Sequence, residues 1–139
     1  MPPERLRERL FRFARALVVG SGATLVDFSI FTTCIRLGGV APTVARLPAL
    51  IAGASVQFAG NRTFTFRARA GSMSRQAKLF LVAELFTLGL NWSVFRLLAP
   101  RIPVLPPEIV GFMGSFIVFV TFAYPVRKLV IFRLPTPGA

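Results

Sequence analysis

Four long apolar runs, separated by short segments rich in arginine and proline, constrain the fold of this sequence most strongly. They cover about residues 16–35, 43–60, 79–98 and 107–124. A helix needs about 20 apolar residues to cross the ~30 Å hydrocarbon core of a bilayer, and inside lipid it satisfies its own backbone hydrogen bonds. We therefore expect an all-α integral membrane protein with four transmembrane helices.

The charge of the chain supports a membrane location. The 139 residues include 17 Lys and Arg against 5 Asp and Glu, a net charge of +12, yet 54% of them are hydrophobic. A soluble nucleic-acid-binding protein would carry such a charge on a chain of average hydrophobicity. Here the basic residues lie between apolar runs, as in membrane proteins whose loops face anionic lipid. We expect contacts with membrane lipids and none with nucleic acid.

The positions of the basic residues predict the orientation. Residues 1–15, 61–78 and 127–133 hold 13 of the 17 Lys and Arg, and the other four lie near the two remaining loops. By the positive-inside rule, the N- and C-termini and the central connection face the cytoplasm. Residues 1–15 are expected to form a basic amphipathic segment on the membrane surface, with a disordered basic tail as the alternative.

The chain is expected to be a single membrane domain, residues 1–139, built from two similar hairpins. Hairpin repeat 1 covers residues 16–67 and hairpin repeat 2 covers residues 79–133. A shift of 66 residues places Arg62 on Lys128 and Phe66 on Phe132. This pattern predicts a parallel repeat of two helical hairpins, although two hydrophobic hairpins also resemble each other by default.

Several polar residues lie inside the apolar runs. Asp27 is about eleven residues into the first run, roughly 16 Å deep and near the midplane of the bilayer. Glu84 and Asn91 share one face of the third predicted helix, and Gln57 and Asn61 share one face of the second. A charge in hydrocarbon costs at least about 2.5–3.5 kcal/mol, so these side chains are expected to face protein or water.

One interpretation of these residues is a polar cleft that opens toward the cytoplasm. Arginines at its mouth would attract phosphate, which a guanidinium can bind through two hydrogen bonds. The sharpest form of this prediction is that one lipid phosphate contacts Arg62, Arg127 and Lys128 together. The full set of candidate substrate-binding residues is Arg12, Arg15, Asp27, Gln57, Asn61, Arg62, Glu84, Asn91, Arg127 and Lys128.

The other interpretation is structural. Glu84 would pair with Arg62 or Lys128, and Asn91 would form a hydrogen bond with Asp27 that holds the helices together. The phenylalanines near the helix ends are expected to anchor the chain at the interface rather than to stack on a sugar. The sequence has no histidine and one cysteine, and it shows no metal-ligand spacing. We expect no enzyme, no catalytic residue, no metal and no cofactor.

Five motifs span about residues 11–133: Phe11-Arg12-Phe13, Val18 to Thr24, Asp27 seven residues after Gly20, Asn61 to Phe66, and Arg127 to Phe132. With these motifs the chain resembles the GtrA-like family of small four-helix membrane proteins. Phe64 stands where such proteins often have tryptophan, and Glu84 replaces an expected small residue. The resemblance implies a multi-pass protein of the bacterial inner membrane that takes part in cell-surface polysaccharide synthesis.

Three functions remain open at this point. The resemblance implies either a flippase for a polyprenyl-phosphate-linked sugar or a non-transporting scaffold that supports a polyprenyl-phosphate glycosyltransferase. Because four helices form a narrow path, we expect a homodimer. The third possibility is a proton-coupled exporter of small cations that uses Asp27 or Glu84 as its membrane acid. The many arginines argue against a path for cations.

Overall fold

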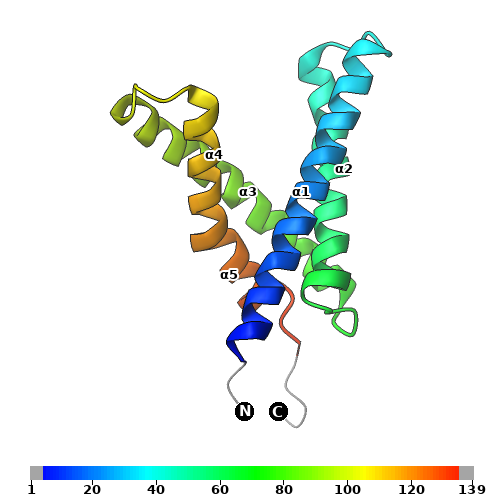
Figure 1. The fold of residues 1–139 in the computed structure, drawn as a ribbon. Helices are drawn as coiled ribbons and strands as arrows, with labels where there is room; N and C mark the ends of the chain where they lie inside the picture. Colours follow the sequence, from blue (N-terminus) through cyan, green and yellow to red (C-terminus); the bar gives the residue numbers. More distant parts are fainter. Residues whose placement is uncertain (1–4, 135–139) are drawn as a thin grey trace. The chain divides into compact units, whose positions relative to one another are not determined.

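The structure is a computed structural model that describes residues 5–134. Every regular element in this range is helical, and no strand occurs there. The chain divides into two compact units, Met1–Arg69 and Ala70–Ala139. Each unit contains one helical hairpin (Figure 1). The all-α expectation is therefore confirmed for the described residues.

The first unit is a hairpin of α1 (Leu6–Arg36) and α2 (Pro42–Gly60), which run side by side (Figure 1). At 1.5 Å per residue the 31 residues of α1 extend about 46 Å, which exceeds the ~30 Å hydrocarbon core. The surface segment expected within residues 1–15 is not a separate element from Leu6 onward. It continues into the first apolar run because no glycine or proline interrupts the helix there.

Small residues on α2 allow its backbone to approach α1 closely, as the sequence predicts. A Cβ atom on Gly53 would lie 3.0 Å from the Cβ of Asp27 and 3.2 Å from the carbonyl oxygen of Ala23. A Cβ atom on Gly60 would lie 2.7 Å from Cγ1 of Val19. These two contacts fix the register of α2 against α1.

The second helix ends in a π-helix, η1 (Asn61–Thr65). The Phe66 N–H donates to the carbonyl oxygen of Asn61 at 2.9 Å, and the Ala68 N–H donates to that of Arg62 at 2.6 Å. Between these bonds Arg67 has a φ of +50°. Helix ends usually place glycine in this left-handed conformation, and another residue there costs about 1–3 kcal/mol.

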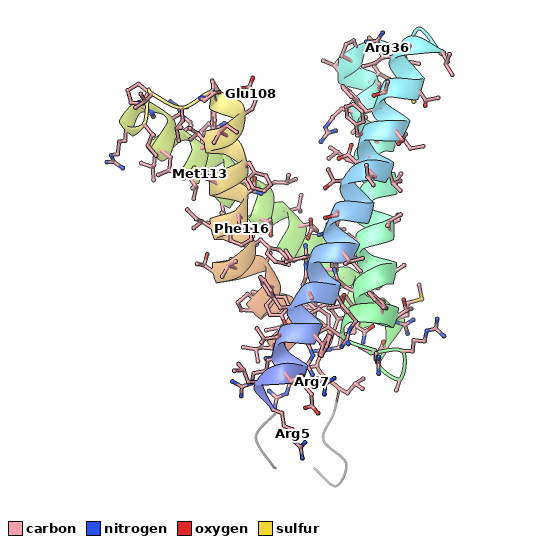
Figure 2. All side chains as sticks on the ribbon, in the orientation of Figure 1. Arg5, Arg7, Arg36, Glu108, Met113 and Phe116 are labelled. Atoms are coloured by element: carbon pink, nitrogen blue, oxygen red, sulfur yellow. The ribbon has the colours of Figure 1, made fainter. Side chains whose placement is uncertain are left out.

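The second unit begins with α3 (Met73–Leu98), whose first turn is capped by the Ser72 hydroxyl, which accepts from the Arg75 N–H. A 3₁₀ turn, η2 (Ala99–Arg101), ends this helix. The returning helix starts as α4 (Pro107–Val118), which packs against α3. Figure 2 labels Glu108 in its first turn and Phe116 further along it.

The returning helix then changes its winding three times. It continues through a π-helix, η3 (Phe119–Ala123), the short α5 (Tyr124–Val126) and a second π-helix, η4 (Arg127–Ile131). The Phe132 N–H donates to the carbonyl oxygen of Arg127 at 3.0 Å. Each hairpin therefore ends in a five-residue π-helix followed by phenylalanine, at positions 66 residues apart.

Three helices among the described residues are long and apolar enough to cross a membrane: Leu6–Arg36, Met73–Arg101 and Pro107–Ile131. The span expected over residues 43–60 corresponds to the 19-residue α2, which does not belong to this group. Arg46, Pro48 and Gln57 lower the mean hydropathy of that helix. Its close contact with α1 nevertheless keeps it alongside the longest of the three apolar helices.

Candidate functional site

A basic pocket of about 340 Å³ lies in the first unit, where α1 begins and the exit of α2 passes it. We call it the arginine pocket. It is lined by Glu8, Phe11, Arg12, Arg15, Thr65, Phe66 and Arg67. Three guanidinium groups face one carboxylate, so the pocket carries an excess of positive charge. Two phenylalanine rings add apolar surface. This combination suits an anionic group attached to an apolar chain.

Arg15 connects the two sides of the arginine pocket. Its Nη2 donates to the carbonyl oxygen of Thr65 at 3.3 Å, and its guanidinium carbon lies 5.9 Å from the centroid of the Phe64 ring. The Nε of Arg15 and the hydroxyl of Thr65 are buried without a hydrogen-bond partner among the described residues. An unsatisfied buried polar group costs about 1–3 kcal/mol, so both groups would gain from a polar ligand in the pocket.

A second charged site lies in the other half of the same hairpin, toward the loop between α1 and α2. Arg46 donates through Nη1 to Oδ1 of Asp27 at 2.7 Å and through Nη2 to Oδ2 at 3.2 Å. The ring of Phe31 lies 5.5 Å from the Arg46 guanidinium. The side chain of Arg46 is 47% exposed and that of Asp27 is 22% exposed. This ion pair is therefore open on the side of the arginine.

The second unit has its own ion pair, which is closed. Nη2 of Arg127 donates to Oε1 of Glu84 at 2.6 Å, and the Arg127 side chain is only 5% exposed. Its guanidinium lies 5.4 Å from the ring of Phe80, which in turn contacts the ring of Phe132. The pair ties α3 to η4 and holds Arg127 inside the hairpin.

The sequence model described as "GtrA/DPMS, transmembrane domain" matches residues 15–132, a range that includes both hairpins. The chain belongs to this family. No solved structure matches it. Membership confirms the resemblance inferred from the motifs. Together with three helices of spanning length and composition, it makes this GtrA/DPMS protein a multi-pass membrane protein.

The structure brings some of the predicted site residues of this GtrA/DPMS protein together. Arg12 and Arg15 both line the arginine pocket. Arg62 lies outside that lining and donates through Nη2 to the carbonyl oxygen of Arg69 at 3.0 Å. The partner of Glu84 is Arg127, where Arg62 or Lys128 was expected. The joint phosphate contact of Arg62, Arg127 and Lys128 stays a prediction, because these residues belong to different units.

Four predicted residues have other surroundings. Asp27, for which Asn91 was one expected partner, is bound by Arg46 from its own hairpin. Asn61 is buried with neither side-chain polar atom paired, and the Asn91 side-chain oxygen is likewise buried without a partner among the described residues. Gln57 lies on α2 between Gly53 and Gly60 and is half-buried.

Sequence reasoning missed Arg46 and Arg67 as site residues. Arg46 was counted as a loop charge because it lies only four residues after the start of α2. Arg67 was counted as part of a basic connection. One feature of the sequence could have indicated the unusual backbone near Arg67. The chain leaves the helix after Phe66, and residues 61–70 contain no glycine to adopt the left-handed conformation that often ends a helix.

Proposed function

We propose that this protein translocates a polyprenyl-phosphate-linked sugar across the bacterial inner membrane, for the synthesis or modification of a cell-surface polysaccharide. The observation that carries the proposal is the arginine pocket, which opens at the end of a membrane hairpin and combines three cations with two aromatic rings. Membership of the GtrA/DPMS family supports the same class of lipid substrate, because the resemblance links such proteins to polyprenyl-phosphate sugars.

In the proposed mechanism the pocket faces the cytoplasm and binds the phosphate of the lipid. A phosphodiester carries one negative charge, and Arg12, Arg15 and Arg67 supply hydrogen-bond donors in the planar arrangement that suits phosphate. The polyprenyl chain stays in the bilayer beside the exposed apolar residues of α1, such as Val18 and Leu25. The protein therefore needs to shield only the phosphate and the sugar from hydrocarbon.

The strained backbone at Arg67 supports a binding role. A glycine would adopt the φ of +50° without steric cost, so the stability of this helix end favours glycine. The arginine side chain lines the pocket instead. An observed strained residue at a candidate site is a reason to propose function there.

Substitution Arg67→Gly tests the proposal because binding and stability should change in opposite directions. We expect the variant to be more stable by about 1 kcal/mol in detergent, since the strain is removed. We expect its affinity for geranylgeranyl phosphate to fall about 10- to 100-fold, the worth of one charge-assisted hydrogen bond. Arg69→Gln is the control, because Arg69 is exposed in the same connection and does not line the pocket.

Translocation itself is measured in liposomes that contain the purified protein and a labelled polyprenyl-phosphate sugar. We expect transfer above that of empty vesicles, and a loss of transfer in Arg67→Gly that matches its loss of binding. Transfer no faster than in empty vesicles would refute the flippase. Full transfer by Arg67→Gly would show that the arginine pocket is not the entry site.

The scaffold remains a second candidate, because the first turns of α1 extend beyond the thickness of a bilayer and expose Leu6 and Leu10 between arginines. Such a surface would suit a glycosyltransferase. If Arg62→Ala and Asp27→Ala abolish sugar transfer to the cell surface while capture of the partner enzyme is unchanged, scaffolding is not the essential role. If capture is lost together with transfer, the scaffold is favoured.

The proton-coupled exporter has less support. Asp27 and Glu84 each form an ion pair with an arginine, so neither acid stands alone on a helix face as a cation carrier would need. We also propose that the working form is a homodimer, because one copy supplies only four helices around a path for a sugar. Its mass in a mild detergent, measured by light scattering, tests this point.

A further inference from the structure

The ion pair between Arg46 and Asp27 differs from the pair between Arg127 and Glu84 in its exposure. Arg127 is 5% exposed in its pair with Glu84, whereas the Arg46 side chain is 47% exposed. Charged side chains inside the bilayer usually face the protein interior, whereas long basic side chains near helix ends extend toward the interface. Arg46 instead leaves nearly half of its side chain exposed at the surface of the hairpin.

The location of the pair follows from helix geometry. Arg46 is four residues from the start of α2, and Asp27 is nine residues from the end of α1. At 1.5 Å per residue these positions lie about 6 Å and about 14 Å from the loop end of the hairpin. Figure 2 shows the two ends of α1, with Arg5 and Arg7 at one and Arg36 at the other. Arg46 therefore lies near the end of the hairpin opposite the arginine pocket.

The contact itself has the geometry of phosphate recognition. Two parallel hydrogen bonds join the guanidinium to the two carboxylate oxygens of Asp27, at 2.7 and 3.2 Å. A phosphate ester offers the same pair of oxygens to an arginine. A guanidinium has five N–H donors, of which Asp27 uses two, so the remaining donors of Arg46 let a phosphate approach before the carboxylate leaves.

We propose that Arg46 is a second phosphate-binding site of the first hairpin, in which the carboxylate of Asp27 takes the place of the phosphate when no lipid is bound. The ligand is the phosphate ester of an amphiphile. That this ligand is a polyprenyl-phosphate sugar leaving the arginine pocket rests on the proposed function. An anionic phospholipid of the surrounding leaflet has the same chemistry.

The exchange changes the charge of the site by the charge of the bound phosphate. Without lipid, Arg46 and Asp27 neutralise each other, which lowers the cost of holding a cation in the bilayer. A bound phosphodiester brings one negative charge to Arg46 and releases the carboxylate of Asp27, so the site then has a net charge of −1 and the carboxylate opposes binding. Because the arginine pocket and Asp27 are about 12 residues, or roughly 18 Å, apart along α1, a phosphate would find one basic site near each end of the hairpin.

The stoichiometry of phosphate binding tests the proposal in nanodiscs of phosphatidylcholine with geranylgeranyl phosphate as the probe, measured by native mass spectrometry. The wild-type chain should bind two probe molecules. The Arg46→Gln and Arg67→Gly variants should each bind one. Arg36→Gln is the matched control, an exposed arginine at the same end of the hairpin, and should still bind two. Two probe molecules bound by Arg46→Gln would overturn the inference while leaving the arginine pocket intact.

Removing the competing carboxylate of Asp27 should raise the affinity for the probe, whereas removing Arg46 should lower it. Asp27→Asn keeps the size of the side chain and frees Arg46, so probe affinity at this site should rise by at least about tenfold. Arg46→Lys keeps the charge of the pair, and therefore its folding, but loses the two parallel bonds and should bind more weakly than wild type. Affinity that falls in Asp27→Asn as much as in Arg46→Gln would make the pair structural and refute the proposal.

The source of the phosphate is decided by a second arm in nanodiscs of phosphatidylglycerol. If one equivalent of phosphatidylglycerol remains bound to the wild type but not to Arg46→Gln and blocks the probe, the ligand is the surrounding phospholipid. If the probe still binds with two equivalents per chain, the site prefers the polyprenyl phosphate. If Arg46→Gln binds both the probe and phosphatidylglycerol as the wild type does, the proposal is wrong.

Discussion

Removing one partner of the Glu84–Arg127 pair should destabilise the second hairpin more than removing both charges. The Nη2–Oε1 distance is 2.6 Å, and the side chains are 5% exposed for Arg127 and 22% exposed for Glu84. Arg127→Met leaves a carboxylate without its cation inside a membrane hairpin, which should cost about 3–5 kcal/mol. Arg127→Met combined with Glu84→Gln leaves no charge, and its stability should lie within about 1–2 kcal/mol of the wild type.

The stabilities of the wild type, the two single variants and the double variant form a double-mutant cycle. Each stability is measured by titrating the purified protein in mild detergent with sodium dodecyl sulfate. The single tryptophan, Trp92, lies on α3 of the same hairpin and reports its unfolding. Arg133→Met is the control, since Arg133 is exposed just after η4 and its loss should change stability by less than about 0.5 kcal/mol. Additive effects of the two single substitutions would show that the pair is not coupled, and would refute the reasoning.

Three further predictions concern helix packing, the arginine pocket and the orientation of the chain. Gly53→Ala should lower the stability of the first hairpin by about 1–3 kcal/mol, because the new Cβ would lie 3.0 Å from an atom of α1. Gly22→Ala is the control and should leave the stability unchanged, because nothing lies within 4 Å of a Cβ there. Thermal unfolding of the two variants measures the difference. Thr65→Val should be neutral or stabilising without ligand, because the buried hydroxyl has no partner, yet should reduce the rise in melting temperature caused by geranylgeranyl phosphate. In a cysteine-free background, an impermeant maleimide added to intact cells should label Leu37→Cys and not Ser74→Cys; the reverse pattern would invert the proposed orientation.

The existence of the helices was largely predictable from the sequence, but several of their ends were not. The prolines at 42 and 107 mark the starts of α2 and α4, as expected. In contrast, α3 starts at Met73, before the expected run of 79–98, and the returning helix continues past residue 124 to Ile131. The continuity of α1 was not predicted, because a basic amphipathic segment and a transmembrane run have the same helical period. Charge pattern alone does not show where one helix would end and another begin.

The ion-pair partners were not predictable, because they depend on how far one helix slides along the other. The contact of Gly53 with Asp27 sets this position in the first hairpin, and Arg46 is then the cation within reach of the carboxylate. Without that register, Asp27 could equally be matched to Asn91 at similar depth. The role of Arg67 was hidden for another reason: a left-handed arginine contradicts residue preference, and only the backbone reveals it.

That Asp27 and Glu84 each find their partner within their own hairpin has a consequence for synthesis at the ribosome. Asp27 meets its partner 19 residues later, so the first hairpin can leave the translocon without a net intramembrane charge soon after α2 has emerged. Glu84 waits for a partner 43 residues later. At about 5–20 residues per second this takes roughly 2–9 s. During that interval α3 holds an unpaired acid and should remain in the translocon until the last helix arrives.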